Sequence, residues 1–82
     1  MAIHVQIVTP RGIAFTGEVL DVQAPGELGE FGVLPGHIPF LTTLRPGILA
    51  LRNSDGVKKF TIGAGFAEAG PSRMVVLTES CE

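Results

Sequence analysis

The sequence predicts an all-β fold, a two-sheet β-sandwich of about ten short strands, and two observations lead to it. First, 11 glycines and 6 prolines are spread along the 82 residues. They divide the chain into segments mostly shorter than an average helix of about 11–12 residues. Second, the segments between them alternate apolar and polar residues or are rich in β-branched side chains, as strands are.

Two N-terminal segments show the alternation most clearly. Residues 3–7 read Ile-His-Val-Gln-Ile, and residues 20–24 read Leu-Asp-Val-Gln-Ala. Because successive side chains of a strand point to opposite faces, each segment has one apolar and one polar face. We expect the apolar faces to be buried between the two sheets.

Two hairpins are expected in the second half of the chain. The turn residues Asn53-Ser54-Asp55-Gly56 separate 48–52 from 57–62, and Asp-Gly supplies the positive φ of a tight turn. Ala69-Gly70-Pro71-Ser72 separates 65–69 from 73–78 in the same way. Each pair of segments is therefore predicted to form adjacent antiparallel strands.

Two other segments have an unusual composition. Residues 48–51, Ile-Leu-Ala-Leu, are apolar throughout, which predicts a strand covered on both faces. Residues 63–68, Gly-Ala-Gly-Phe-Ala-Glu, begin like a nucleotide-binding glycine motif, but Glu68 stands in place of the third glycine and a turn follows instead of a helix. We interpret these glycines as a place of close backbone approach.

Composition excludes several classes of protein. Hydrophobic residues make up 45% of the chain, enough for one core, so we expect a single domain spanning 1–82. A single cysteine, Cys81, excludes a disulfide scaffold. Eight acidic and six basic residues, without Trp or Tyr, argue against nucleic-acid binding. The longest apolar run, residues 74–77, is far short of the roughly 20 residues that span a bilayer, so we expect no membrane insertion and see no signal peptide.

Few residues could support catalysis or bind a metal ion. No serine or cysteine has a histidine nearby in sequence, and His4 and His37 lack the spacing of metal ligands. No pair of acidic residues has a spacing typical of acid–base catalysis. Cys81, next to the C-terminus, is expected to fray. The sequence therefore predicts no enzyme, no metal site and no cofactor.

The most unusual segment, residues 25–39, contains four glycines and three prolines but is not polar. One interpretation is a pair of tight turns around one short strand, with Phe31 or Val33 buried. The other is a shaped surface for protein contacts, with Glu30 and His37 as polar contacts, because loops on rigid scaffolds often carry binding. The residues alone leave both open. Its apolar side chains are Leu28, Phe31, Val33, Leu34 and Ile38.

Residues 29–42, Gly-Glu-Phe-Gly-Val-Leu-Pro-Gly-His-Ile-Pro-Phe-Leu-Thr, resemble the signature of the epsilon subunit of F-type ATP synthases, called delta in mitochondria. The resemblance covers nearly the whole chain, because other segments match the same family in the same order. These are residues 4–10 followed by 15–17, Leu44-Arg45-Pro46-Gly47, Gly65-Phe66-Ala67-Glu68 and residues 75–78.

The resemblance implies a ten-stranded β-sandwich that is a non-catalytic subunit of the central stalk, or rotor, of a proton-translocating ATP synthase. Such a subunit links gamma to the c ring and couples rotation to ATP synthesis. By the same resemblance, Glu30 matches a position that faces the c ring, and apolar neighbours such as Phe31 should add affinity. His37, Thr9 and Thr42 match positions that face gamma.

The resemblance also bounds these expectations. The C-terminal helical hairpin of the family is absent from residues 1–82, so its inhibitory and ATP-binding roles are not implied. A place on the cytoplasmic side of a bacterial inner membrane, as a peripheral part of the complex, is implied. We also expect the chain alone to be a monomer in dilute solution. Two alternatives stay open: an unrelated β-sandwich adaptor that binds another protein, and an enzyme that uses His37 and Glu30.

Overall fold

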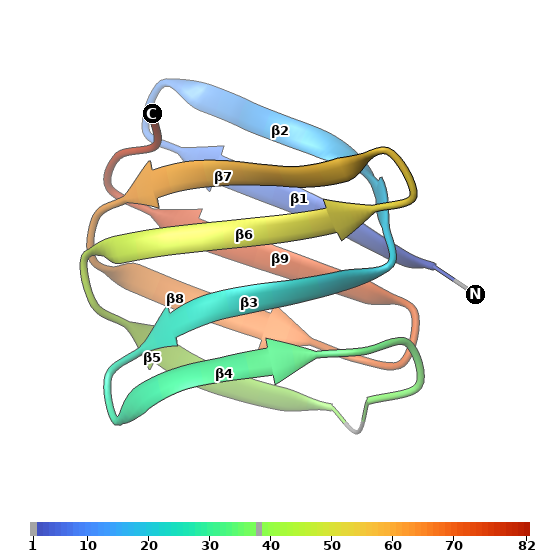
Figure 1. The fold of residues 1–82 in the computed structure, drawn as a ribbon. Helices are drawn as coiled ribbons and strands as arrows, with labels where there is room; N and C mark the ends of the chain where they lie inside the picture. The colour runs from blue at the N-terminus through green and yellow to red at the C-terminus, as the bar shows by residue number, and fades with distance from the viewer. Residues whose placement is uncertain (1, 38) are drawn as a thin grey trace.

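The computed structural model describes residues 2–37 and 39–82 and contains nine β-strands and no helix within them. The strands lie in two layers, with β2, β1, β9, β8 and β5 in one and β7, β6, β3 and β4 in the other (Figure 1). The predicted all-β sandwich is therefore confirmed, with nine strands in the described residues where about ten were expected. The strands are β1 (Ile3–Thr9), β2 (Gly12–Val19), β3 (Asp21–Gly26), β4 (Gly29–Val33), β5 (Phe40–Leu44), β6 (Gly47–Asn53), β7 (Gly56–Ile62), β8 (Gly65–Ala69) and β9 (Arg73–Thr78).

Hydrogen bonds run from one layer into the other, so the two layers form one curled sheet. The connection is narrow: β3 and β5 pair only at Gly26 and Leu44. β1 and β9 are parallel, and every other pair of neighbouring strands is antiparallel. This arrangement leaves the edges of β4 and β5 close together at one side of the sandwich and those of β2 and β7 at the other (Figure 1).

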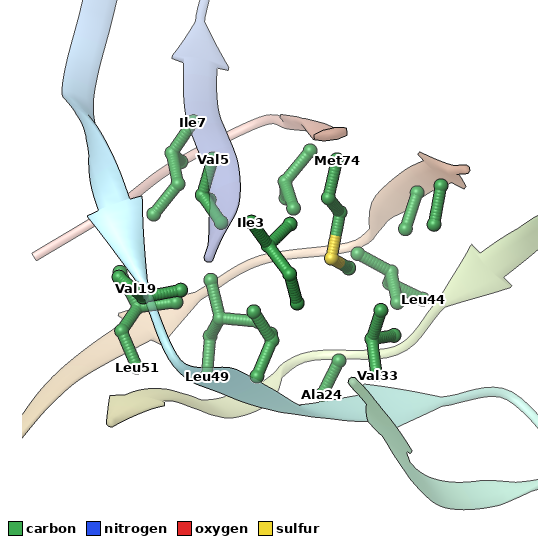
Figure 2. Packing of buried hydrophobic residues seen from close by; sticks show 14 of the residues in the cluster. Ile3, Val5, Ile7, Val19, Ala24, Val33, Leu44, Leu49, Leu51 and Met74 are labelled. Carbon is green, nitrogen blue, oxygen red and sulfur yellow. The ribbon is translucent and has the colours of Figure 1, made fainter. Parts of the chain in front are cut away.

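The core lies between the layers and is built by strand alternation. In β1, Ile3, Val5 and Ile7 are fully buried, whereas His4 is exposed, as the sequence predicts. Figure 2 shows their side chains pointing toward Leu49 and other residues of the opposite layer. The other buried hydrophobic residues are Val19, Val22, Ala24, Val33, Leu44, Leu51, Ile62, Ala67, Ala69, Met74 and Val76.

Both predicted hairpins are confirmed. β6 and β7 pair from Gly47 with Ile62 to Asn53 with Gly56, which leaves a two-residue turn. Gly56 has φ +133°, a conformation that side-chain-bearing residues rarely adopt. β8 and β9 pair across the second turn, where the Gly70 amide donates a hydrogen bond of 2.9 Å to the Arg73 carbonyl.

The glycines of residues 63–68 serve close backbone approach, as predicted. A Cβ on Gly65 would lie 1.9 Å from the Leu77 carbonyl oxygen of the neighbouring strand, so no larger residue fits without moving β8 or β9. The described residues include no helix long and apolar enough to cross a membrane.

Two predictions about local structure were wrong. The strand β6 is covered on one face only, since Leu49 and Leu51 are buried but Ile48 is 47% exposed. Cys81 does not fray: it forms a bridge with Ile62 and packs against the core, where burial raises the pKa of its thiol. The following residue, Glu82, exchanges two backbone hydrogen bonds of 2.9 Å with Thr61. This anchoring was missed because the backbone pairing joins residues that are far apart in sequence.

Candidate functional site

Of residues 25–39, those up to His37 form the β3–β4 hairpin and the turn that follows it. The hairpin closes between Gly26 and Gly29, and Gly29 has φ +137°. In the second turn Gly36 has φ +88°, and its amide donates a hydrogen bond of 2.7 Å to the Pro71 carbonyl. Two tight turns around a short strand, with Val33 buried, thus describe the segment correctly. Ile38, grouped with its apolar residues in the sequence, lies outside the described residues.

A surface hollow of about 420 Å³ lies where the edges of β4 and β5 approach each other. Phe31 and Phe40 line it, and their rings meet edge to face with centroids 5.5 Å apart. The imidazole of His37 lies 4.9 Å from the Phe40 ring, centroid to centroid. Its other lining residues are Gly26, Leu28, Gly29, Glu30, Gly32 and Thr42. We call this feature the β4–β5 hollow.

The β4–β5 hollow brings together four of the five residues that the resemblance assigned to partner contacts. They come from three places: Glu30 and Phe31 from β4, His37 from the turn and Thr42 from β5. The four residues meet because the chain reverses its direction between β4 and β5. Neighbours in the sequence motif are thus also neighbours on the surface.

The fifth residue, Thr9, is not in this hollow but at the end of β1. Its hydroxyl oxygen accepts a hydrogen bond of 3.1 Å from the Arg11 amide and donates one of 3.3 Å to the Gly12 carbonyl. The hydroxyl therefore supports the β1–β2 turn. Thr9 and Pro10 border an apolar depression that Val8, Phe66 and Leu77 also line.

That depression belongs to an apolar row across the outer face of the five-stranded layer, which sequence reasoning did not find. Ile13 pairs with Val8, Val8 with Leu77, and Leu77 with Phe66, so the four side chains share one face of four adjacent strands. We call them the outer-face stripe. Ile13, Leu77 and Phe66 are 59%, 49% and 52% exposed. Only the strand register reveals the row, because Val8 and Ile13 are far in sequence from Phe66 and Leu77.

We also searched the described residues for a metal site and for histidines outside the hollow. No three of their His, Cys, Asp and Glu side chains lie close enough together to hold a metal ion. Outside the hollow, His4 Nε2 lies 3.4 Å from the Thr16 hydroxyl on the exposed surface.

Comparison with known proteins assigns the family. The sequence profile described as "ATP synthase, Delta/Epsilon chain, beta-sandwich domain" matches residues 2–82. The chain belongs to this family. The resemblance seen in the motifs is thus confirmed, and with it the assignment to an ATP synthase.

Curated relatives carry the name ATP synthase epsilon chain. The chain is 46% identical to that of Caulobacter vibrioides over 77 residues, which cover 94% of this chain and 90% of the relative. It is 47% identical to that of Desulfatibacillum aliphaticivorans over 81 residues, which cover 98% of this chain and 57% of the relative. The chain therefore spans most of the first relative and a little over half of the second.

Solved structures support the fold. A chain in the structure of the Euglena gracilis mitochondrial ATP synthase, titled "OSCP/F1/c-ring", superimposes with a TM-score of 0.91 at 24% identity, covering 99% of this chain and 52% of that one. A chain of the Tetrahymena thermophila enzyme, titled "central stalk/cring", gives a TM-score of 0.81 at 16% identity, covering 100% and 66%.

The family assignment also decides between the alternatives. The enzyme alternative required a pocket that holds Glu30 and His37 together, and the β4–β5 hollow does hold both. The chain nevertheless belongs with epsilon chains of ATP synthases, so it is a subunit of a larger enzyme without a catalytic role of its own. An unrelated adaptor is excluded for the same reason.

Proposed function

We propose that this domain is a rotor subunit of a proton-translocating ATP synthase that links gamma to the c ring. The observation that carries the proposal is the match to the epsilon family over residues 2–82. The titles of two solved structures with this fold, which name a c ring or a central stalk, support it further. As part of that complex, the domain is peripheral on the cytoplasmic side of a bacterial inner membrane.

The β4–β5 hollow is the proposed meeting point of the two partners. Glu30 and Phe31 contact the c ring from β4, while His37 and Thr42 contact gamma from the neighbouring turn and β5. An exposed charge alone contributes roughly 0–1 kcal/mol to such a contact. The aromatic rings beside Glu30 therefore supply more of the binding free energy than its carboxylate does.

The outer-face stripe extends the proposed gamma contact on the side of Thr9. Several half-exposed apolar side chains in one row are unfavourable in water, and an interface removes that cost at about 25 cal/mol per Å² of apolar area buried. Thr9 borders the stripe, which is consistent with its assignment to gamma. A tightly packed sandwich with short turns also suits a rotating joint, because it transmits force without local unfolding.

Calorimetric titration of the chain with its cognate gamma subunit tests the proposal. We expect tight one-to-one binding that His37→Ala weakens. Glu30→Ala should leave gamma binding unchanged and weaken binding only when the c ring is present. Absence of any association with a folded gamma subunit would overturn the rotor assignment.

A further inference from the structure

One residue of the outer-face stripe is turned outward by a β-bulge. Ile7 of β1 pairs with Phe15 of β2. The next residue, Val8, pairs with Ile13, so β2 has one extra residue at this point. Without the extra residue, strand alternation would place Ile13 on the inner face with Phe15. The bulge thus aims an apolar side chain at solvent, where it is 59% exposed, and such an arrangement is typical of a contact surface.

The depression that the stripe borders lies at the opposite end of the row, over β9 and the start of β8. Its volume is about 460 Å³. Two of its lining residues, Ala64 and Gly65, have little or no side chain with which to fill it. Among its described lining residues, Glu79 is the charged one. One face of the domain therefore carries a protruding apolar side chain on β2 and an apolar depression two to three strands away.

We propose that two copies of this chain associate through their outer-face stripes, each placing Ile13 against the depression of the other. The strands β2, β1, β9 and β8 lie side by side in this order (Figure 1). A two-fold axis parallel to the strands, midway between β1 and β9, places β1 over β9 of the second copy and β2 over β8. Val8 then lies over Leu77 of the second copy. Ile13 lies over Phe66, at the border of the depression.

The polar residues around the stripe fit the same axis. Thr16 shares a row with Glu68 and lies over Glu68 of the second copy, where its hydroxyl can donate a hydrogen bond to the carboxylate. The β1–β2 turn, which carries Arg11, lies over Glu79 of the second copy, so opposite charges face each other. A two-fold axis along the stripe would instead set Ile13 against Ile13 and the depression against Glu68. The strand-parallel axis is therefore the one that the surface favours.

The size of this surface predicts a weak dimer. Strands lie about 4.8 Å apart and rise about 3.3 Å per residue, so four strands of about six residues cover roughly 400 Å² in flat projection. Side chains add to the accessible area, and two such surfaces bury about 1,000 Å² in total, below the roughly 1,200–2,000 Å² of stable complexes. We therefore expect a monomer in dilute solution and a dimer at high concentration.

This inference goes beyond the proposed function and rests on it at one point only. The stripe is also the proposed gamma contact, so one copy cannot bind gamma and a second copy at the same time. In the free domain the dimer covers the apolar stripe, and gamma replaces the second copy during assembly. Gamma is therefore expected to dissociate the dimer.

Sedimentation equilibrium of the full 82-residue chain, from low micromolar to millimolar concentration, tests the proposal. We expect a dimer fraction that grows with concentration. Ile13→Thr should weaken dimer formation about tenfold, because the lost apolar contact occurs twice in a symmetric interface. The matched control, Ile48→Thr, changes a residue that is 47% exposed on the four-stranded layer and should have no effect. A chain that stays monomeric at millimolar concentration, or a dimer that both variants weaken equally, would overturn the proposal.

A pair of charged variants tests the predicted contact between Ile13 and Phe66. Ile13→Glu and Phe66→Arg should each prevent dimer formation, because each places a charge against an apolar side chain at both contacts. An equimolar mixture of the two variants should form a heterodimer. In it the introduced carboxylate meets the introduced guanidinium group at one contact, and the other contact is that of the parent chain. If both variants are folded by circular dichroism and their mixture stays monomeric, the predicted pairing is wrong.

Titration with gamma separates this inference from the proposed function. Conversion of the dimer into a one-to-one complex with gamma would support both. A chain that binds gamma but is monomeric at every concentration would overturn this inference and leave the proposed function in place. A dimer that does not associate with a folded gamma subunit would do the reverse.

Discussion

The outer faces of the two layers differ in how their exposed residues are paired. On the five-stranded layer, apolar residues of the outer-face stripe pair with one another across β2, β1, β9 and β8. On the four-stranded layer, Ile48 pairs with Thr61 and Val57 with Arg52, so these two exposed apolar side chains lie opposite polar ones. Both faces therefore expose apolar area, but only the first gathers it into a continuous surface suited to a partner.

The largest expected effect concerns the space that each layer leaves for an added Cβ atom. Gly65→Ala should destabilise the domain by about 3 kcal/mol or more, because its Cβ would overlap the backbone of β9 that lies beneath the stripe. Gly32→Ala on the four-stranded layer should cost less than about 1 kcal/mol, since its Cβ meets only the end of the Gln23 side chain, at 2.9 Å. Chemical denaturation of both variants measures the difference, and similar losses would contradict it.

The second prediction tests whether gamma uses the stripe. Phe66→Thr combined with Leu77→Thr should weaken gamma binding by about 30-fold, since burial of each apolar side chain in an interface contributes roughly 1 kcal/mol or more. Threonine suits strands, so the unfolding midpoint should change little. The measurement is calorimetric titration with gamma.

The matched control is Ile48→Thr combined with Val57→Thr on the other face, where the exposed fractions are 47% and 55%. These variants should bind gamma like the parent chain. If the control pair weakened binding as much as the stripe pair, gamma would contact the four-stranded layer, and the comparison between the faces would lose its functional meaning.

The sequence predicts local features of this molecule better than those that depend on register. Alternation in residues 3–7 identifies a buried face, and the turn residues at 53–56 and 69–72 identify two hairpins, because both signals lie within a few neighbouring positions. The stripe could not be predicted, since Val8 and Leu77 become neighbours only through the parallel pairing of β1 with β9. The anchoring of Cys81 is missed for the same reason.

The candidate site shows the same limit. The motif at 29–42 identifies Glu30, Phe31, His37 and Thr42, and the structure brings them together because the chain reverses within the motif. Their partners were assigned by resemblance, not by chemistry visible in the sequence. The aromatic pair that shapes the hollow depends on Phe31 and Phe40 facing each other across two layers, which no sequence spacing specifies.

The smallest expected effect concerns the ion pair on the outer face of the four-stranded layer. Arg52 Nε donates a hydrogen bond of 2.6 Å to Asp21 Oδ2, across the pairing of β3 with β6. A double-mutant cycle with Asp21→Asn and Arg52→Gln, followed by chemical denaturation, should give a coupling free energy of about 0.5–1 kcal/mol that decreases at high salt. The ion pair makes this face partly polar, unlike the apolar stripe on the five-stranded layer. A coupling free energy of zero would show that the ion pair does not stabilise the layer. The difference between the two outer faces would then rest on their apolar residues alone.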